Sequence, residues 1–265
     1  MKVISIFNLK GGVGKTTTAY NMAYELEKRG YSVLAIDNDK QGNLSKAFEV
    51  YDNNTICGTA KMLMNKDEYI NTSDFMKTTH HPHIYIINAN MSLLSATYNI
   101  TGEEAAGQNE KYKKIINQSI SEYVPEKALK NCFDYCIIDN PPDIALNVVN
   151  ALTITDEVII PLTMDEWGLE GLDIVVEQIE EVKKYLNKNI KILGAIVTKY
   201  KNNDSNIAGL EWLKNKRNIP VLAKIRYTEK AAESTFFQKP IYEYSSRCGA
   251  AQDYKNFIKQ YLKEK

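Results

Sequence analysis

The sequence predicts an α/β fold with a single doubly wound, mostly parallel sheet and helices on both faces. Two features predict it. Short apolar segments rich in Val and Ile alternate with longer amphipathic segments, and this alternation continues along the whole chain. No internal repeat or linker rich in Pro, Gly and Ser divides the chain, so residues 1–265 are expected to form one domain.

The expected strands are short, apolar and β-branched, which is typical of strands buried on both faces of a sheet. Two of them end directly in an aspartate, at Asp37 and Asp139. In chain order the expected strands span residues 2–8, 32–37, 83–88, 135–139, 157–161, 190–197 and 221–225.

The expected helices carry apolar side chains three or four residues apart. In the first, Ala19, Met22 and Leu26 form one stripe, and Gly30 ends the segment. In chain order the expected helices span residues 16–29, 58–65, 68–77, 112–123, 169–186, 206–216 and 250–262.

The composition is that of an ordinary soluble protein, with 44% hydrophobic and 25% charged residues. No apolar run approaches the roughly 18–20 residues that a membrane span needs. Asn8 and Lys10 interrupt the N-terminal apolar stretch before a signal-peptide core forms, and four cysteines do not make a disulfide framework. We therefore expect a cytoplasmic protein.

The zero net charge conceals an asymmetry. Residues 1–182 carry 15 Lys and Arg against 26 Asp and Glu, a net charge of −11, whereas residues 183–265 carry 18 against 7, a net charge of +11. Charge separation of this kind indicates an anionic partner or, alternatively, the solvated faces of surface helices.

The most informative segment is a glycine-rich loop between an expected strand and an expected helix, the setting that a phosphate-binding loop requires. Its backbone N–H groups and the following helix N-terminus would bind phosphate oxygens. Lys15 would reach the β- and γ-phosphates, and the Thr16 hydroxyl would bind Mg²⁺. The predicted nucleotide-binding residues are Lys10, Gly11, Gly12, Val13, Gly14, Lys15, Thr16 and Thr17.

The ordinary pattern G-x-x-x-x-G-K-[ST] does not fit, because its first glycine would fall on Leu9, and a lysine, Lys10, stands before the glycine pair. In this respect the sequence resembles the deviant Walker A ATPases, the P-loop NTPase family of ParA, Soj, MinD and the nitrogenase iron protein. The resemblance implies that Lys10 crosses a nucleotide-sandwich homodimer and contacts the ATP of the partner subunit.

Two acidic segments extend the resemblance. Residues 37–43 are similar to the family segment D-x-D-P-Q-G-N, with Lys40 in place of proline, and Asp139 resembles the Walker B acid. The resemblance implies that Asp39 positions the attacking water and that Asp37 and Asp139 lie near Mg²⁺ with Thr16. It therefore implies a Mg²⁺-dependent ATPase with Lys10, Lys15 and Asp39 as catalytic residues, slow because no arginine finger is evident.

The similarity continues to the C-terminal third. Residues 233–241 resemble the family segment E-A-x-x-x-G-K-P-I, with Gln238 replacing the glycine. Lys230 then falls where chromosomal ParA proteins carry an arginine implicated in nonspecific DNA binding, with Lys224 and Arg226 beside it. Since no helix-turn-helix precedes the loop, the sequence resembles the short ParA or Soj type. This implies a nucleoid-associated partition ATPase for plasmids or chromosomes, with a ParB-like or other centromere-binding adaptor.

Other functions remain as alternatives. A MinD-like membrane-positioning ATPase would use an amphipathic C-terminal helix, but helix 250–262 is expected to dock on the core instead. A Walker-type tyrosine kinase is suggested by 17 tyrosines, which are scattered rather than gathered in a tail. Cys132 and Cys136 could bind an iron–sulfur cluster, but small side chains in the core are the favoured interpretation. Residues 80–83 could bind a metal, but a solvated loop is favoured there.

Overall fold

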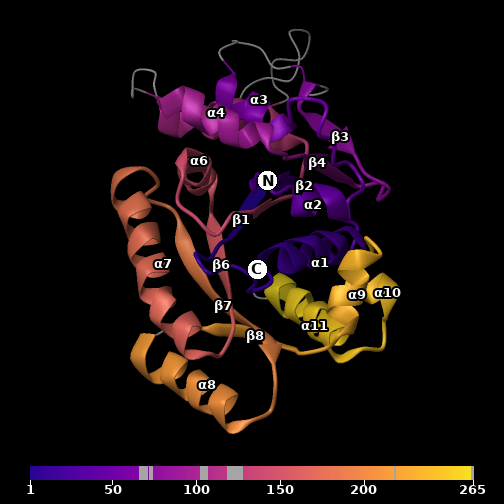
Figure 1. Cartoon of the computed structure of the whole chain (residues 1–265), viewed down its shortest axis with the longest axis vertical. Coiled ribbons are helices and arrows are strands. Elements are labelled where there is room, and N and C mark those ends of the chain that lie inside the picture. The colour runs from indigo at the N-terminus through magenta and orange to yellow at the C-terminus, as the bar shows by residue number, and fades with distance from the viewer. Residues whose placement is uncertain (66–70, 72–73, 102–106, 118–127, 218, 264–265) are drawn as a thin grey trace.

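The computed structural model describes residues 1–65, 71, 74–101, 107–117, 128–217 and 219–263, and these form one eight-stranded sheet with helices on both faces (Figure 1). The strand order is β3-β4-β2-β5-β1-β6-β7-β8, and every neighbouring pair is parallel except β3 with β4. This confirms the predicted doubly wound, mostly parallel sheet. The strands are β1 (Lys2–Ile6), β2 (Val33–Asp37), β3 (Met76–Thr78), β4 (Ile84–Ile87), β5 (Tyr135–Asp139), β6 (Glu157–Leu162), β7 (Lys191–Tyr200) and β8 (Val221–Arg226).

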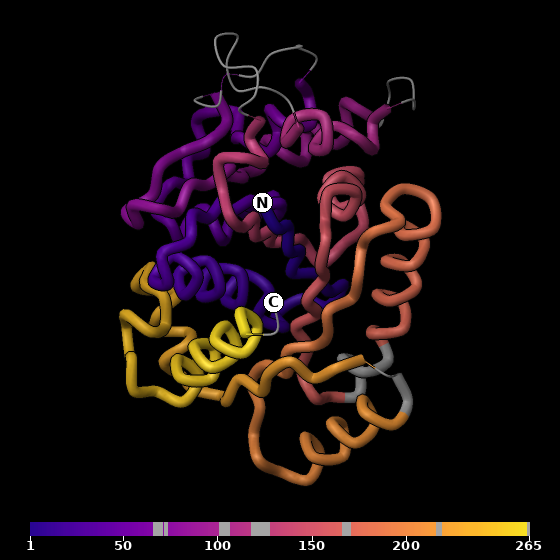
Figure 2. The backbone as a smooth tube through the Cα atoms, turned by 180° about the vertical axis from the view of Figure 1, so that it is seen from behind, coloured from indigo at the N-terminus to yellow at the C-terminus, as the bar shows by residue number. Residues whose placement is uncertain are grey.

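The helices form a layer on each face of the sheet, as the views from the two sides show (Figures 1 and 2). One face is covered by α1 and α11 with the short α2 and α10 beside them, and the other by α3 to α8. The α-helices are α1 (Lys15–Glu27), α2 (Asn43–Ala47), α3 (Gly58–Met64), α4 (Ser92–Thr101), α5 (Lys111–Asn117), α6 (Leu146–Ile154), α7 (Glu166–Tyr185), α8 (Asp204–Arg217), α9 (Lys230–Phe236), α10 (Ile241–Tyr244) and α11 (Gly249–Lys263). Two short 3₁₀ turns are η2 (Gln108–Glu110) and η3 (Leu129–Asn131).

Most predicted elements are present, and the two helices predicted between α3 and β5 extend into residues that the structure does not describe. The helix predicted over residues 68–77 is wrong at its C-terminal end, because Met76–Thr78 forms the antiparallel edge strand β3; residues 68–70 and 72–73 lie outside the described residues. The helix predicted over residues 112–123 is confirmed for α5, and its remainder lies outside the described residues.

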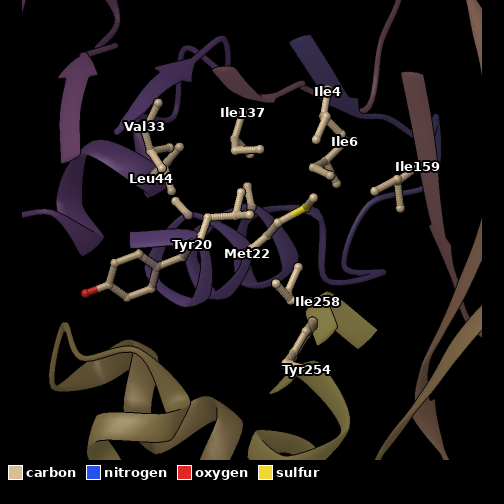
Figure 3. Close-up of a cluster of buried hydrophobic side chains, with 14 of the residues drawn as sticks. Ile4, Ile6, Tyr20, Met22, Val33, Leu44, Ile137, Ile159, Tyr254 and Ile258 are labelled. Carbon is tan, nitrogen blue, oxygen red and sulfur yellow. The ribbon is translucent and has the colours of Figure 1, made fainter. Parts of the chain in front are cut away.

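The C-terminal helix α11 is part of the core. Its Tyr254 and Ile258 point toward α1 and the sheet, in the same buried cluster as Met22 of α1 and Ile6 of β1 (Figure 3). The Tyr254 hydroxyl also lies 3.1 Å from the Thr18 hydroxyl of α1, within hydrogen-bond distance. The apolar face of α11 is therefore occupied by the protein interior, as predicted. Among the described residues, no helix has the length and apolar run needed to cross a bilayer.

The strand register brings the C-terminal ends of β1, β2 and β5 to one edge of the sheet. Asp37 at the end of β2 pairs in register with Asp139 at the end of β5, and Asp139 pairs with Ile6 at the end of β1. The three loops that follow these parallel strands therefore leave the sheet at the same edge. In doubly wound sheets ligands bind at this carboxyl edge.

Candidate functional site

The loop after β1 folds tightly through two glycines in the left-handed region. Gly12 has φ +72° and Gly14 has φ +85°, a conformation that other residues adopt only with strain. Strand β7, which lies beyond β6 in the sheet, holds this loop, since the Thr198 hydroxyl donates to the Val13 carbonyl at 2.8 Å and Lys199 Nζ donates to the Gly12 carbonyl at 2.9 Å. The helix α1 begins directly after the loop, as phosphate binding requires.

Lys15 lies at the first position of α1 and is 7% exposed. Its ammonium donates to the Lys10 carbonyl at 2.9 Å, so it lies over the loop. Burial lowers the pKa of Lys15, and the carboxylates of Asp139, Asp39 and Asp143 oppose this shift. The ammonium is therefore held inside an acidic site, where an anionic ligand would add a favourable partner.

Lys10 points away from this site. Its ammonium forms an ion pair with the Asp165 carboxylate, which also accepts a hydrogen bond from the Thr163 hydroxyl at 2.7 Å. The side chain is 31% exposed and does not line the cavity that Lys15 lines. Lys10 is therefore held by the loop after β6 and is not directed into the cavity.

Asp37 and Asp39 flank the turn after β2. Asp37 is buried, and it accepts hydrogen bonds from the backbone N–H and the hydroxyl of Ser45, both at 2.7 Å, and from the Asp39 N–H at 3.2 Å. Asp39 is half-buried and accepts from the Gln41 N–H at 2.9 Å. Asp37 thus organises the turn, and the Asp39 side chain lines the cavity.

Asp139 is the acid with unused hydrogen-bonding capacity. Both of its carboxylate oxygens are buried, and neither has a hydrogen-bond partner in the described part of the chain. Burial and the nearby Asp37 carboxylate raise its pKa well above the usual range, whereas the Thr16 hydroxyl and the Lys15 ammonium lower it. A buried carboxylate with so little hydrogen bonding is costly and fits a site that a cation occupies.

The loop borders a cavity of about 750 Å³. It is lined by the phosphate loop with Asp39 and Asp143, and also by residues 225–229, 231, 232 and 235 and by Tyr254. This volume lies within the range of roughly 300–1,000 Å³ that is typical of small-molecule sites. The lining combines charged side chains, such as Lys15, Asp39 and Arg226, with alanine and aromatic side chains.

The three predicted DNA contacts all have partners within the chain. Arg226 lines the cavity and forms a two-pronged pair with Asp253, at 2.9 and 2.8 Å. Lys230 pairs with Glu233 at 2.7 Å, and Lys224 Nζ lies 5.2 Å from the Tyr200 ring centroid. Arg226 and Lys230 remain about half exposed, so they are still accessible.

Comparison with known proteins gives the family. Residues 1–192 match a family described as an AAA domain. The chain is 33% identical over 260 residues to an uncharacterized protein of Methanocaldococcus jannaschii, covering 93% of this chain and 92% of that one. It is 29% identical over 261 residues to the sporulation initiation inhibitor protein Soj of Bacillus subtilis, covering 98% and 97%.

The chain belongs to the ParA/MinD family of P-loop ATPases. A solved structure agrees on the fold: a putative plasmid partition protein of Borrelia burgdorferi bound to AMPPNP matches with a TM-score of 0.78 at 23% identity, covering 100% of this chain and 99% of that one. ATP hydrolysis is the chemistry that this family's P-loop supports in general.

Several residues that shape the site in this ParA/MinD-family chain were not predicted from the sequence. Thr198 and Lys199 come from β7, about 185 residues after the loop that they hold. Asp165 and Asp143, which pair with Lys10 and Lys40, follow strand ends at the same edge. A signal for the two aspartates exists, because each acid follows an expected strand, but the partner lysines cannot be chosen without the topology.

Proposed function

We propose that this chain is a Mg²⁺-dependent partition ATPase that dimerises on ATP, binds DNA nonspecifically and is released from DNA by hydrolysis. The observation that carries the proposal is the arrangement of two lysines on one loop. Lys15 lies inside the cavity, whereas Lys10 points out of it toward Asp165. In the proposed dimer, Lys15 would bind the nucleotide of its own subunit, and Lys10 would contact the nucleotide of the partner subunit.

ATP would lie along the cavity. Its phosphates would bind the glycine loop, Lys15 and the N-terminus of α1, and its base would lie at the end of the cavity lined by Tyr227, Ala231 and Ala232. An apolar and aromatic pocket is suited to a planar base. Arg226, held by Asp253, borders that end.

The residues at the phosphate end fit Mg²⁺. Asp139 offers two buried oxygens without hydrogen-bond partners, and Thr16 lies close enough to influence its pKa. Within the described part of the chain no group of three or more His, Cys, Asp and Glu side chains forms a complete metal site. That fits a cation held partly by phosphates and water. Thr16 and Asp139 would hold it, with Asp37 near the shell, and the ion would neutralise charge on the phosphates.

Asp39 is the residue proposed to position the attacking water. It lines the cavity with Lys15, while its neighbour Asp37 is committed to Ser45. Since hydrolysis requires water in line with the leaving phosphate, an accessible carboxylate at this edge suits the role better than a fully engaged one.

The DNA-binding part of the proposal is supported by the basic C-terminal third, with its net charge of +11, and by the exposed Lys230 and Arg226. Contacts to phosphates need accessible cations and no base-reading element. A ParB-like or other centromere-binding adaptor would stimulate hydrolysis, and the protein would act on plasmids or chromosomes in the cytoplasm, at the nucleoid. The MinD-like alternative is weakened because α11 buries its apolar face in the core.

The proposal is tested by measuring phosphate release and oligomeric state for three variants. We expect Lys15→Ala to lose nucleotide binding and Asp39→Ala to bind ATP and accumulate as a dimer without hydrolysing it. The control Lys113→Ala removes an exposed lysine of α5 outside the site and should match the wild type. A monomeric Asp39→Ala protein with saturating ATP would contradict the sandwich dimer.

A further inference from the structure

Lys40 connects two loops at the phosphate end of the cavity. Its ammonium lies 3.2 Å from an oxygen of the Asp143 carboxylate. Lys40 follows Asp39 in the loop after β2, whereas Asp143 lies four residues after Asp139 in the loop after β5. The pair therefore joins the loop of the proposed water-positioning residue to the loop of the proposed magnesium residue.

The bases of these two loops are already fixed by buried amides. Asn38 Nδ2 donates to Asn140 Oδ1 at 2.8 Å and to the Asn147 carbonyl at 3.1 Å, and Asn147 Nδ2 donates back to the Asn38 carbonyl at 2.8 Å. The Tyr112 hydroxyl donates to Asn38 Oδ1 at 2.8 Å. These hydrogen bonds fix the two strand ends relative to each other, but they do not include Asp39 or Lys40.

Beyond these amide hydrogen bonds, fewer contacts hold the tips of the two loops, which carry Lys40 and Asp143. In the Asp39 loop, Gln41 N–H donates to the Asp39 side chain, which stabilises the turn but not its position against the other loop. Across the described residues, the Lys40–Asp143 pair is the ion pair that joins these two tips. The other oxygen of Asp143, Oδ1, is buried and has no hydrogen-bond partner among the described residues. The carboxylate is therefore held through the ion pair of Oδ2 with Lys40.

The pair suits a positioning role better than a stabilising one. Its side chains are 34% and 42% exposed, and ion pairs with that exposure contribute little to folding. Lys40 also stands where the resembling family has proline, a residue that would stiffen the turn directly but provide no link to the opposite loop. In this chain, the Lys40–Asp143 ion pair therefore restrains the loop in place of a turn stiffened by proline.

We propose that the Lys40–Asp143 ion pair is a positioning pair for hydrolysis, which holds the Asp39 loop against the loop after Asp139. The inference rests on the proposed ATPase function and deepens it. Neither residue needs to contact the reacting phosphate. Loss of the pair should therefore slow the chemical step without weakening nucleotide binding.

The test is a double-mutant cycle in steady-state ATP hydrolysis with Mg²⁺, using Lys40→Met, Asp143→Ala, the double variant and the exchanged pair Lys40→Asp with Asp143→Lys. We expect each single variant to lower kcat about fivefold, equivalent to about 1 kcal/mol, with KM within about twofold. The double variant should be no slower than the singles, and the exchanged pair should recover most of the wild-type kcat.

The control Lys113→Met breaks an ion pair with Glu110, also partly exposed but outside the cavity, and should leave kcat unchanged. Unfolding midpoints measured by circular dichroism should agree for all variants, which separates positioning from loss of fold. The inference is overturned if Lys40→Met raises KM with kcat unchanged, or if the exchanged pair is as slow as the singles. A wild-type chain without Mg²⁺-ATP hydrolysis would overturn the proposed function, and this inference with it.

Discussion

Replacing Ile258 by alanine tests whether α11 is a core helix, which separates the proposed function from a membrane-bound one. Ile258 is fully buried between α1 and the sheet (Figure 3). Alanine removes three carbon atoms, which costs about 2.4 kcal/mol at about 0.8 kcal/mol per group. Incomplete collapse of the cavity raises the expected loss to about 3–4 kcal/mol.

The assay is urea unfolding followed by circular dichroism, with Lys259→Ala as the control because Lys259 is the exposed neighbour on the same helix. The control should change the free energy of unfolding by less than about 0.5 kcal/mol. An Ile258→Ala variant as stable as the wild type would refute the docking of α11. If the wild type also sedimented with anionic liposomes in the presence of ATP, a membrane function would replace the proposed one.

Two further predictions concern stability. Burial of His81 lowers its pKa to about 4, below its unfolded value near 6.5, so the stability present above pH 6.5 should fall by about 2–3 kcal/mol on acidification to pH 4.5. His81→Leu should remove this part of the pH dependence in urea titrations, whereas exposed His83→Leu should not. Gln238 has φ +53°, so Gln238→Gly should raise the free energy of unfolding by about 0.5–1 kcal/mol, while Lys239→Gly, outside the left-handed region, should lower it.

The sequence predicted the sheet well because its strands are buried on both faces. Continuous apolar segments such as β5 and β6 are typical of strands covered on both faces, and their parallel direction follows from β-α units, whereas the strand order was not predicted. Five helices of ten residues or fewer in the described part of the chain were not predicted, because short segments give little periodicity; they are α2, α4, α6, α9 and α10. β3 was mistaken for helix because a three-residue edge strand depends on its partner β4.

The candidate site was predictable as far as its chemistry is local. The glycine loop and Lys15 are adjacent in sequence, and the structure brings Asp139 to them through the strand register. The partner of Lys10 and the hydrogen bond from Thr198 were not predictable, because both depend on loops from distant strands meeting at one edge. The placement of Arg226 beside the cavity likewise required the packing of α11 under β8.

The most direct test of the central claim is nonspecific DNA binding measured with ATP, with ADP and without nucleotide over a salt series. We predict binding that requires ATP and weakens steeply with salt, because several phosphate contacts release counterions. Lys230→Ala and Lys224→Ala should each reduce the salt slope by about one, provided each contacts a phosphate. Binding of equal strength in all three nucleotide conditions would contradict the proposal that ATP controls DNA occupancy.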